Sequence, residues 1–174
     1  LSSGLVEGAK GQDTFKVADL IKSTVKGGDG ADLVSASGIV SAGALYGNSG
    51  NDSFVVTGLA TSASTYGGAG NDSMRFSSAD SLIYEGGLGA DSLFVTGRVN
   101  SSTVYGDNAS ATSGGADSIS IGGSASGSFI YANSGDDSVH VVGNVTASQV
   151  SLNTGDDSVS INAGLIASTI YGGS

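Results

Sequence analysis

Apolar and polar residues alternate along this 174-residue chain in short segments that are separated by glycine-rich turns. A representative turn spans residues 67–72, with the sequence Gly-Gly-Ala-Gly-Asn-Asp, and is followed by residues 73–76, Ser-Met-Arg-Phe. Three glycines in four positions suit a backbone with positive φ. Met74 and Phe76, two residues apart, indicate a strand with one buried face. We therefore interpret this segment as a turn that leads into a half-buried strand.

The aspartate that closes this turn recurs along the chain at nearly constant spacing. The equivalent residues, called the anchor aspartates below, are Asp13, Asp32, Asp52, Asp72, Asp91, Asp117, Asp137 and Asp157. Successive intervals are 19, 20, 20, 19, 26, 20 and 20 residues, so one interval carries a six-residue insertion. A fixed period near 20 residues predicts a solenoid.

Each repeat contains two strand patterns. In the first pattern, the second and fourth residues after the anchor aspartate are apolar and the first is mostly serine, as in a strand with one wet face. The second pattern precedes the next turn and holds all six tyrosines. We expect the tyrosines to face outward as a stacked ladder, with the residue before each one, such as Ile83 before Tyr84, facing inward. The charged residues 16–26 are interpreted as a first coil rather than a helix, with Lys26 at the tyrosine position.

These patterns predict an all-β fold, a parallel β-solenoid (β-roll or β-helix) of about eight coils with two strands per coil. The chain contains 30 glycines and no proline or tryptophan, which fits thin coils better than a thick core. Residues 1–174 are expected to form one domain, a fragment or module of a longer or polymeric assembly. Open strand edges at both ends favour end-to-end self-association or continuation of the chain.

The charge balance narrows the class of partners. The net charge is −10, and four of the six basic residues lie in the first 26 positions. Such a surface disfavours nucleic acids and anionic membranes and favours cations. No apolar run reaches transmembrane length, so membrane insertion is not expected. Cysteine is absent, which is compatible with a secreted protein held together by metal rather than by disulfides.

The turns 27–32, 67–72 and 86–91 match the pattern Gly-Gly-x-Gly-x-Asp. With this pattern the chain resembles the RTX (haemolysin-type) calcium-binding repeat proteins, in a divergent version with 20-residue coils. The resemblance implies Ca²⁺ between stacked coils, held by turn carbonyl oxygens and by Asp13, Asp32, Asp52, Asp72, Asp91, Asp117, Asp137 and Asp157. A column of carboxylates about 5 Å apart would repel without hard cations, and Ca²⁺ takes six to eight oxygens.

The chain also departs from the family pattern. The glycine-rich turn lies on one edge of the coil only, so a single row of ions is expected. Residues 132–135 and 152–155 lack the leading glycines, and the turn at 106–117 is twelve residues long. Two alternatives stay open: the aspartates cap their own turns without metal, and the tyrosine column either packs or binds a partner. Asn51, Asn71, Asp136 and Asp156, just before the anchors, add oxygen ligands or hydrogen-bond within the turn.

The resemblance implies a structural calcium-binding module of a secreted, cell-surface bacterial protein, such as an S-layer subunit, a filament or an adhesin stalk. The alternative is an ice-binding or carbohydrate-binding solenoid. An ice-binding face prefers a regular threonine array, whereas Thr24, Thr103 and Thr169 are interrupted by other residue types. No enzymatic activity is expected, because the chain has one histidine, no cysteine and carboxylates in equivalent environments.

Overall fold

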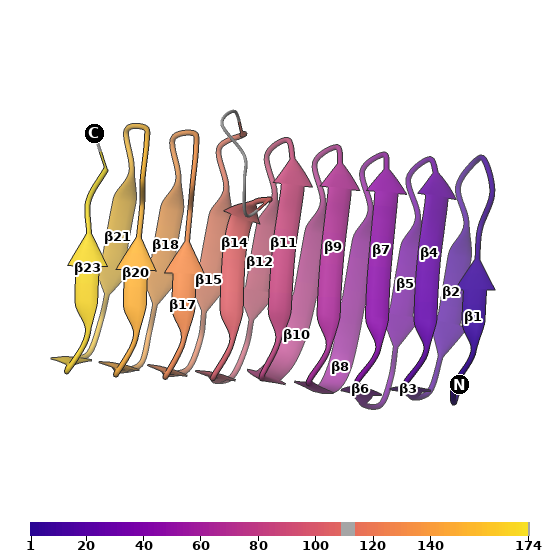
Figure 1. Cartoon of the computed structure of the whole chain (residues 1–174), viewed down its shortest axis with the longest axis horizontal. Helices are drawn as coiled ribbons and strands as arrows, with labels where there is room; N and C mark the ends of the chain where they lie inside the picture. The colour runs from indigo at the N-terminus through magenta and orange to yellow at the C-terminus, as the bar shows by residue number, and fades with distance from the viewer. Residues whose placement is uncertain (109–113, 174) are drawn as a thin grey trace.

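The computed structural model describes residues 1–108 and 114–173, which form a stack of flat coils (Figure 1). Each coil crosses from one sheet to the other, and every strand pairing in the described residues is parallel. The described residues contain strands, turns and bends and no helix. The expected all-β parallel β-solenoid with coils of about 20 residues is therefore confirmed.

One sheet, formed by nine of the described strands, carries the tyrosine column. Its order is β1 (Leu5–Glu7), β4 (Thr24–Asp29), β7 (Ala44–Ser49), β9 (Ser64–Ala69), β11 (Ile83–Leu88), β14 (Thr103–Asp107), β17 (Phe129–Tyr131), β20 (Gln149–Ser151) and β23 (Thr169–Tyr171). Residues 16–26 belong to this regular stack: Lys26 pairs in register with Tyr46. The expected first coil is therefore confirmed.

The second sheet begins after each anchor aspartate. Its longer strands are β2 (Thr14–Val17), β5 (Leu33–Ala36), β8 (Ser53–Thr61), β10 (Ser73–Asp80), β12 (Ser92–Val95), β15 (Ser118–Ile121), β18 (Ser138–Val141) and β21 (Ser158–Ile161). Two-residue strands follow them after a bend: β3 (Leu20–Ile21), β6 (Val40–Ser41), β13 (Val99–Asn100), β16 (Ala125–Ser126), β19 (Val145–Thr146) and β22 (Leu165–Ile166). Strands β8 and β10 run through the bend and pair with both rows. Most coils therefore contain a short third strand in addition to the two that the sequence predicts.

The core is a narrow double column of apolar side chains between the two sheets. The second and fourth residues after the anchors point into it, and Phe54, Met74 and Phe76 are at most 1% exposed. Phe15 and Ile161, in the outermost coils, are only partly buried. Each coil thus buries its apolar side chains against the coils on both sides, as solenoid architecture requires.

The predicted orientation of Tyr84 is wrong. Tyr84 is 1% exposed and aligns with the inward residues Thr65 and Val104, whereas Ile83 is 40% exposed. The register shifts between Phe76 and Ser78 in β10, where this coil is one residue shorter than its neighbour. Every residue after that point moves by one position, so Glu85 rather than Tyr84 occupies the outward column. Counting back from Asp91 identifies this shift, because the tyrosines of the 20-residue coils lie six positions before their anchors.

A column of serine side chains connects neighbouring coils through hydrogen bonds. The backbone N–H of Leu82 donates to Ser102 Oγ at 3.0 Å, and the N–H of Ser128 donates to Ser148 Oγ at 3.0 Å. The hydroxyl of Ser102 in turn donates to the Asn100 carbonyl at 2.7 Å. The same register shift places Leu82 and not Ser81 in this column.

Replacing Phe54 by alanine tests this view of the core. We expect Phe54→Ala to lower the free energy of unfolding by about 3–5 kcal/mol, because the side chain is fully buried between coils. Phe129→Ala is the matched control: Phe129 is 47% exposed, so its loss should stay below about 1 kcal/mol. Urea denaturation of both variants measures the difference, and equal losses would contradict the assigned burial.

Candidate functional site

The glycine-rich turns lie along one edge of the stack, where the chain passes from the nine-stranded sheet to the second sheet (Figure 1). Gly68 and Gly70 have φ values of 116° and 130°, which side chains rarely allow. The turn reverses the chain within four residues and brings Asp72 to the start of β10. Equivalent glycines repeat this geometry in the neighbouring coils, so the anchor aspartates form a column.

The anchor aspartates point into the structure. Asp32, Asp52, Asp72, Asp91, Asp117 and Asp137 are 2–3% exposed. Asp13 and Asp157, in the outermost coils, are partly buried. The predicted column thus exists, but it is a buried column inside the turn rather than a row of carboxylates on the outer edge.

One oxygen of each buried carboxylate is used between coils. The backbone N–H of Asp52 donates to Asp72 Oδ1 at 2.7 Å, and the N–H of Asp72 donates to Asp91 Oδ1 at 2.7 Å. The same bond, at 2.7–2.9 Å, joins every consecutive pair of anchors from Asp13 to Asp157. Among the described residues, the alternative in which each aspartate caps its own turn is seen only at Asp13, whose Oδ2 accepts the Ala9 N–H at 3.2 Å.

The other oxygen, Oδ2, has no hydrogen-bond partner from Asp32 to Asp157. These seven buried atoms belong to Asp32, Asp52, Asp72, Asp91, Asp117, Asp137 and Asp157. Each of the first five faces a glycine on the opposite wall of the turn. A Cβ on Gly67, for example, would lie within 3.0 Å of both Asp72 Oδ2 and the Gly86 carbonyl oxygen of the next coil. Two oxygens of different coils therefore flank one small space at the glycine.

Burial makes the Asp72, Asp91, Asp117 and Asp137 carboxyls weak acids. It raises the pKa of Asp72 to about 7, and the Asp52 N–H hydrogen bond only partly offsets it, while Asp91 and Asp52 add to the rise. Burial likewise raises the pKa of Asp91 and Asp137 to about 6 and that of Asp117 to about 8. An ionised carboxylate in this column is therefore costly unless a positive charge compensates it.

The donor types in the column fit a hard cation. Carboxylate and backbone carbonyl oxygens are the ligands that Ca²⁺ prefers, and both flank the space at Gly67. The side chains alone do not form a cage, because no three His, Asp or Glu side chains converge within the described residues. Carbonyl oxygens would therefore have to supply much of the coordination.

The residues just before the anchors form a second ladder on the surface. The Asn71 N–H donates to Asn51 Oδ1 at 2.8 Å, and the Ala90 N–H donates to Asn71 Oδ1 at 3.0 Å. The Asp156 N–H donates to Asp136 Oδ1 at 2.9 Å. These bonds connect coils and not residues of one turn.

The coils that depart from the family pattern keep the aspartate ladder. Ala132 and Leu152 replace the leading glycine and are buried. In the twelve-residue turn at 106–117, residues 109–113 lie outside the described residues. Asp91 still donates its N–H to Asp117 Oδ1 at 2.8 Å. The insertion therefore leaves the register of the column unchanged.

The outward column that contains Thr24, Thr103 and Thr169 is irregular. Its other members are Leu5, Ala44, Ser64, Ile83, Phe129 and Gln149. Side chains this different in size and polarity form no flat array of hydroxyl and methyl groups. The expected interruption of the threonine pattern is thus present in the structure.

Comparison of the chain with protein-family models, curated proteins and solved structures finds no match. Among the residues that the structure describes, no helix has the length and apolar character needed to cross a membrane.

The glycine wall of the turn can be tested by adding one methyl group. We expect Gly67→Ala to destabilise the fold by about 1–3 kcal/mol, because the new Cβ would collide with Asp72 Oδ2 and the Gly86 carbonyl oxygen. Gly172→Ala is the control, since no atom lies within 4 Å of its Cβ position. Thermal unfolding compares the two, and a neutral Gly67→Ala variant would show that the turn is less closely packed.

The raised pKa values predict how stability depends on pH in metal-free protein. In the folded state the carboxyls of Asp72, Asp91, Asp117 and Asp137 have pKa values of about 6 to 8, whereas the ordinary pKa of an aspartate is 3.8. The folded state therefore binds more protons between these values, and the free energy of unfolding falls as pH rises. We expect the melting temperature of chelated protein to fall by about 5 °C or more from pH 4 to pH 8.

Asp72→Asn provides the control for this pH dependence. Its amide cannot titrate, and its oxygen can still accept the Asp52 N–H, so the variant should show a smaller fall in melting temperature. A melting temperature that is flat or rises over this pH range would contradict the assigned burial of the column.

Proposed function

We propose that this protein is a structural calcium-binding β-solenoid module of a secreted, cell-surface bacterial protein, such as an S-layer subunit, a filament or an adhesin stalk. The observation that carries the proposal is the column of seven buried Oδ2 atoms without a hydrogen-bond partner. Buried polar atoms are usually satisfied, so each of these oxygens needs a proton, a water molecule or a cation. The resemblance of the turns to RTX repeats favours calcium.

The residues that would hold calcium are the anchor aspartates, through Oδ2, and the carbonyl groups of the turn glycines in the next coil. Asp32, Asp52 and Asp72 face such carbonyls across Gly27, Gly47 and Gly67. When bound, calcium supplies the positive charge that the column lacks. The protein contributes the Oδ1 ladder, which fixes each carboxylate between coils before any ion arrives.

The proposed mechanical role follows from the position of the ligands. Each candidate site uses oxygens from two neighbouring coils, so calcium would stabilise the stacked state and not the separated coils. Binding would therefore drive folding and stiffen the stack where free calcium is plentiful, outside the cell. No chemical reaction is part of this role.

The proposal includes growth of the stack at its ends, through a second copy or through further coils. Edge strands expose backbone groups that can pair with another strand. The last coil also exposes Leu165, Ile166 and Tyr171 by 48–52%, and the first exposes Leu5 by 59%. A neighbouring coil would cover these side chains.

Calcium addition to chelated protein tests the proposal. We expect heat of binding in calorimetry and a rise in melting temperature of about 10 °C or more at saturating calcium, because several sites stabilise one folded state. Magnesium at the same concentration should have much less effect, because it demands a smaller, nearly ideal octahedral site. Absence of both heat and stabilisation would refute the calcium role and leave a column satisfied by protons.

Asp72→Asn separates the calcium role from the structural one. The variant should keep its β-rich circular dichroism spectrum and, at pH 4, where the Asp72 carboxyl carries its proton, its metal-free melting temperature, because the amide oxygen preserves the bond from Asp52. It should lose part of the calcium-induced rise, because the amide removes one negative charge from the column. An unchanged calcium response would place the ions elsewhere.

A further inference from the structure

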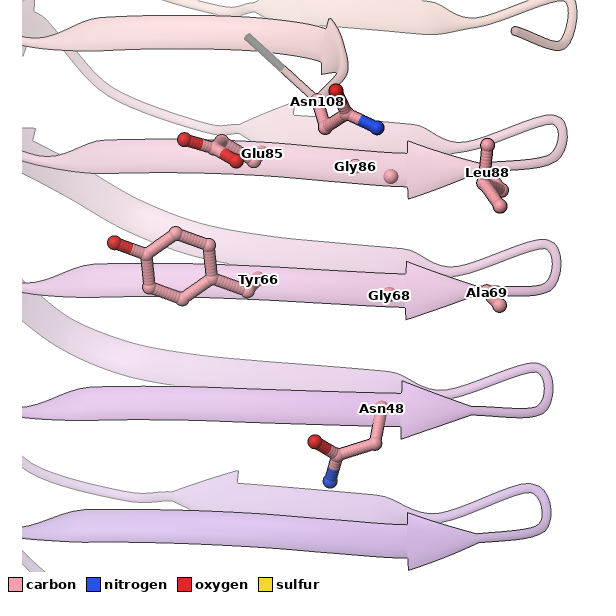
Figure 2. A pocket seen from close by; sticks show the side chains of 9 residues that line it. Asn48, Tyr66, Gly68, Ala69, Glu85, Gly86, Leu88 and Asn108 are labelled. Carbon is pink, nitrogen blue, oxygen red and sulfur yellow. The ribbon is translucent and has the colours of Figure 1, made fainter. Parts of the chain in front are cut away.

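A hollow of about 370 Å³ lies on the outer face of the nine-stranded sheet, near the ends of β7, β9 and β11 (Figure 2). Asn48 borders it on one side, and Leu88 and Ala69 border it at the turns. Tyr66 and Glu85 lie next to each other along its inner side. Its volume is in the lower part of the range for small-molecule sites.

The hollow exists because two neighbouring coils lack a side chain at the same position. Gly68 and Gly87 are paired in register, and Asn48 occupies the equivalent position in the coil before them. Both glycines have positive φ, at 116° and 121°. The floor of the hollow therefore consists of backbone atoms, and the polar and aromatic side chains lie around it.

Glu85 lies between two pairs of tyrosines in the outward column beside this floor. Tyr46 and Tyr66 stack with their ring centroids 4.9 Å apart, and Tyr105 and Tyr131 stack at 5.2 Å. Glu85 is paired in register with Tyr66 on one side and Tyr105 on the other. One face of Tyr66 is occupied by Tyr46, and the next coil on the other side offers a carboxylate instead of a ring.

The carboxylate of Glu85 forms no ion pair in the described part of the chain, where the three ion pairs are Lys10–Asp29, Lys26–Glu7 and Arg98–Asp80. Burial raises the pKa of Glu85 above its ordinary value. This half-buried acid lies beside an aromatic ring and has no cationic partner, so its negative charge is uncompensated.

Elsewhere in the same column, an acidic side chain forms an ion pair with a lysine. Glu7 occupies the position of Glu85 in the first coil, and Lys26 occupies that position in the next coil. The Lys26 ammonium lies 3.2 Å from Glu7 Oε1. At Glu85 both neighbouring positions are tyrosines, so no lysine of this column can reach it in the same way.

We propose that the hollow binds an organic cation, an alkylammonium or guanidinium group, which pairs with Glu85 and stacks on Tyr66. Carboxylates pair with both groups, and a cation over a tyrosine face gains further attraction. The net charge of −10 favours approach of a cation. This inference is independent of the proposed calcium role, because Glu85 is not part of the aspartate column.

Titration with n-butylguanidinium and n-butylammonium, followed by ¹H–¹⁵N NMR, tests the proposal on the full chain. We expect saturable shifts at the amides of Gly68, Glu85 and Gly87, with dissociation constants in the millimolar range. Glu85→Gln should weaken binding at least about tenfold, because it removes a charged hydrogen-bond acceptor. Tyr66→Leu should weaken it about two- to fivefold through loss of the aromatic face.

Glu7→Gln is the matched control, because Glu7 lies in the same column but is already paired with Lys26. It should leave the affinity unchanged. n-Butanol, a neutral probe of similar length, should cause no saturable shifts. Putrescine and Nα-acetyl-lysine methylamide distinguish a free amine from a protein side chain as the source of the cation, and tighter binding of either supports the proposal.

Three results would overturn it. These are no saturable shift with either cation, equal affinity of the Glu85→Gln variant, and shifts that spread over the whole acidic surface. Saturable binding of methyl β-glucoside without binding of the cations would also overturn it and would indicate a carbohydrate site.

Discussion

The structure depends on how each coil accommodates one buried carboxylate. Every anchor aspartate from Asp32 to Asp157 uses Oδ1 to hold the backbone of the coil before it, and this bond repeats at 2.7–2.9 Å along the stack. The bond brings a charge-bearing group into the interior, where ionisation is costly. Opposite Asp32, Asp52, Asp72, Asp91 and Asp117 the wall is glycine, because a Cβ there would collide with Oδ2. Ala132 and Leu152 take this position in the turns of Asp137 and Asp157. In the first five of these turns, glycine and aspartate thus belong to one contact between coils.

The sequence repeat predicts most of the regular features of the fold. Spacing of the aspartates predicted the parallel stack, and the alternation after each aspartate predicted the inward residues, because pleated strands alternate strictly. Tyr84 was misplaced because a one-residue deletion near Ser77 changes the register before the tyrosine position. The tyrosine looked like a member of its column by residue type, and only the distance to Asp91 revealed the shift.

The candidate site was only partly predictable. Asp72 could be located from the sequence, but its hydrogen bond goes to another coil, and local turn rules describe bonds within one turn. The same reason explains why the serine ladder was missed: Ser102 and Leu82 are 20 residues apart. The hollow at Gly68 and Gly87 depends on which residues become neighbours across coils, and that required the exact register.

The coil accommodates changes in length at two places and keeps the aspartate column intact at both. The two 19-residue coils are shorter by one residue at the bend, one between Val17 and Leu20 and one near Ser77, and the long coil gains residues after Asp107. Asp107 Oδ1 accepts the Gly115 N–H at 3.3 Å, and its Oδ2 accepts the Ser134 N–H at 2.9 Å. The two ends of the extra segment are thereby held together on a rigid frame. A foreign peptide grafted between them would be displayed from the side of the rod without breaking its internal order.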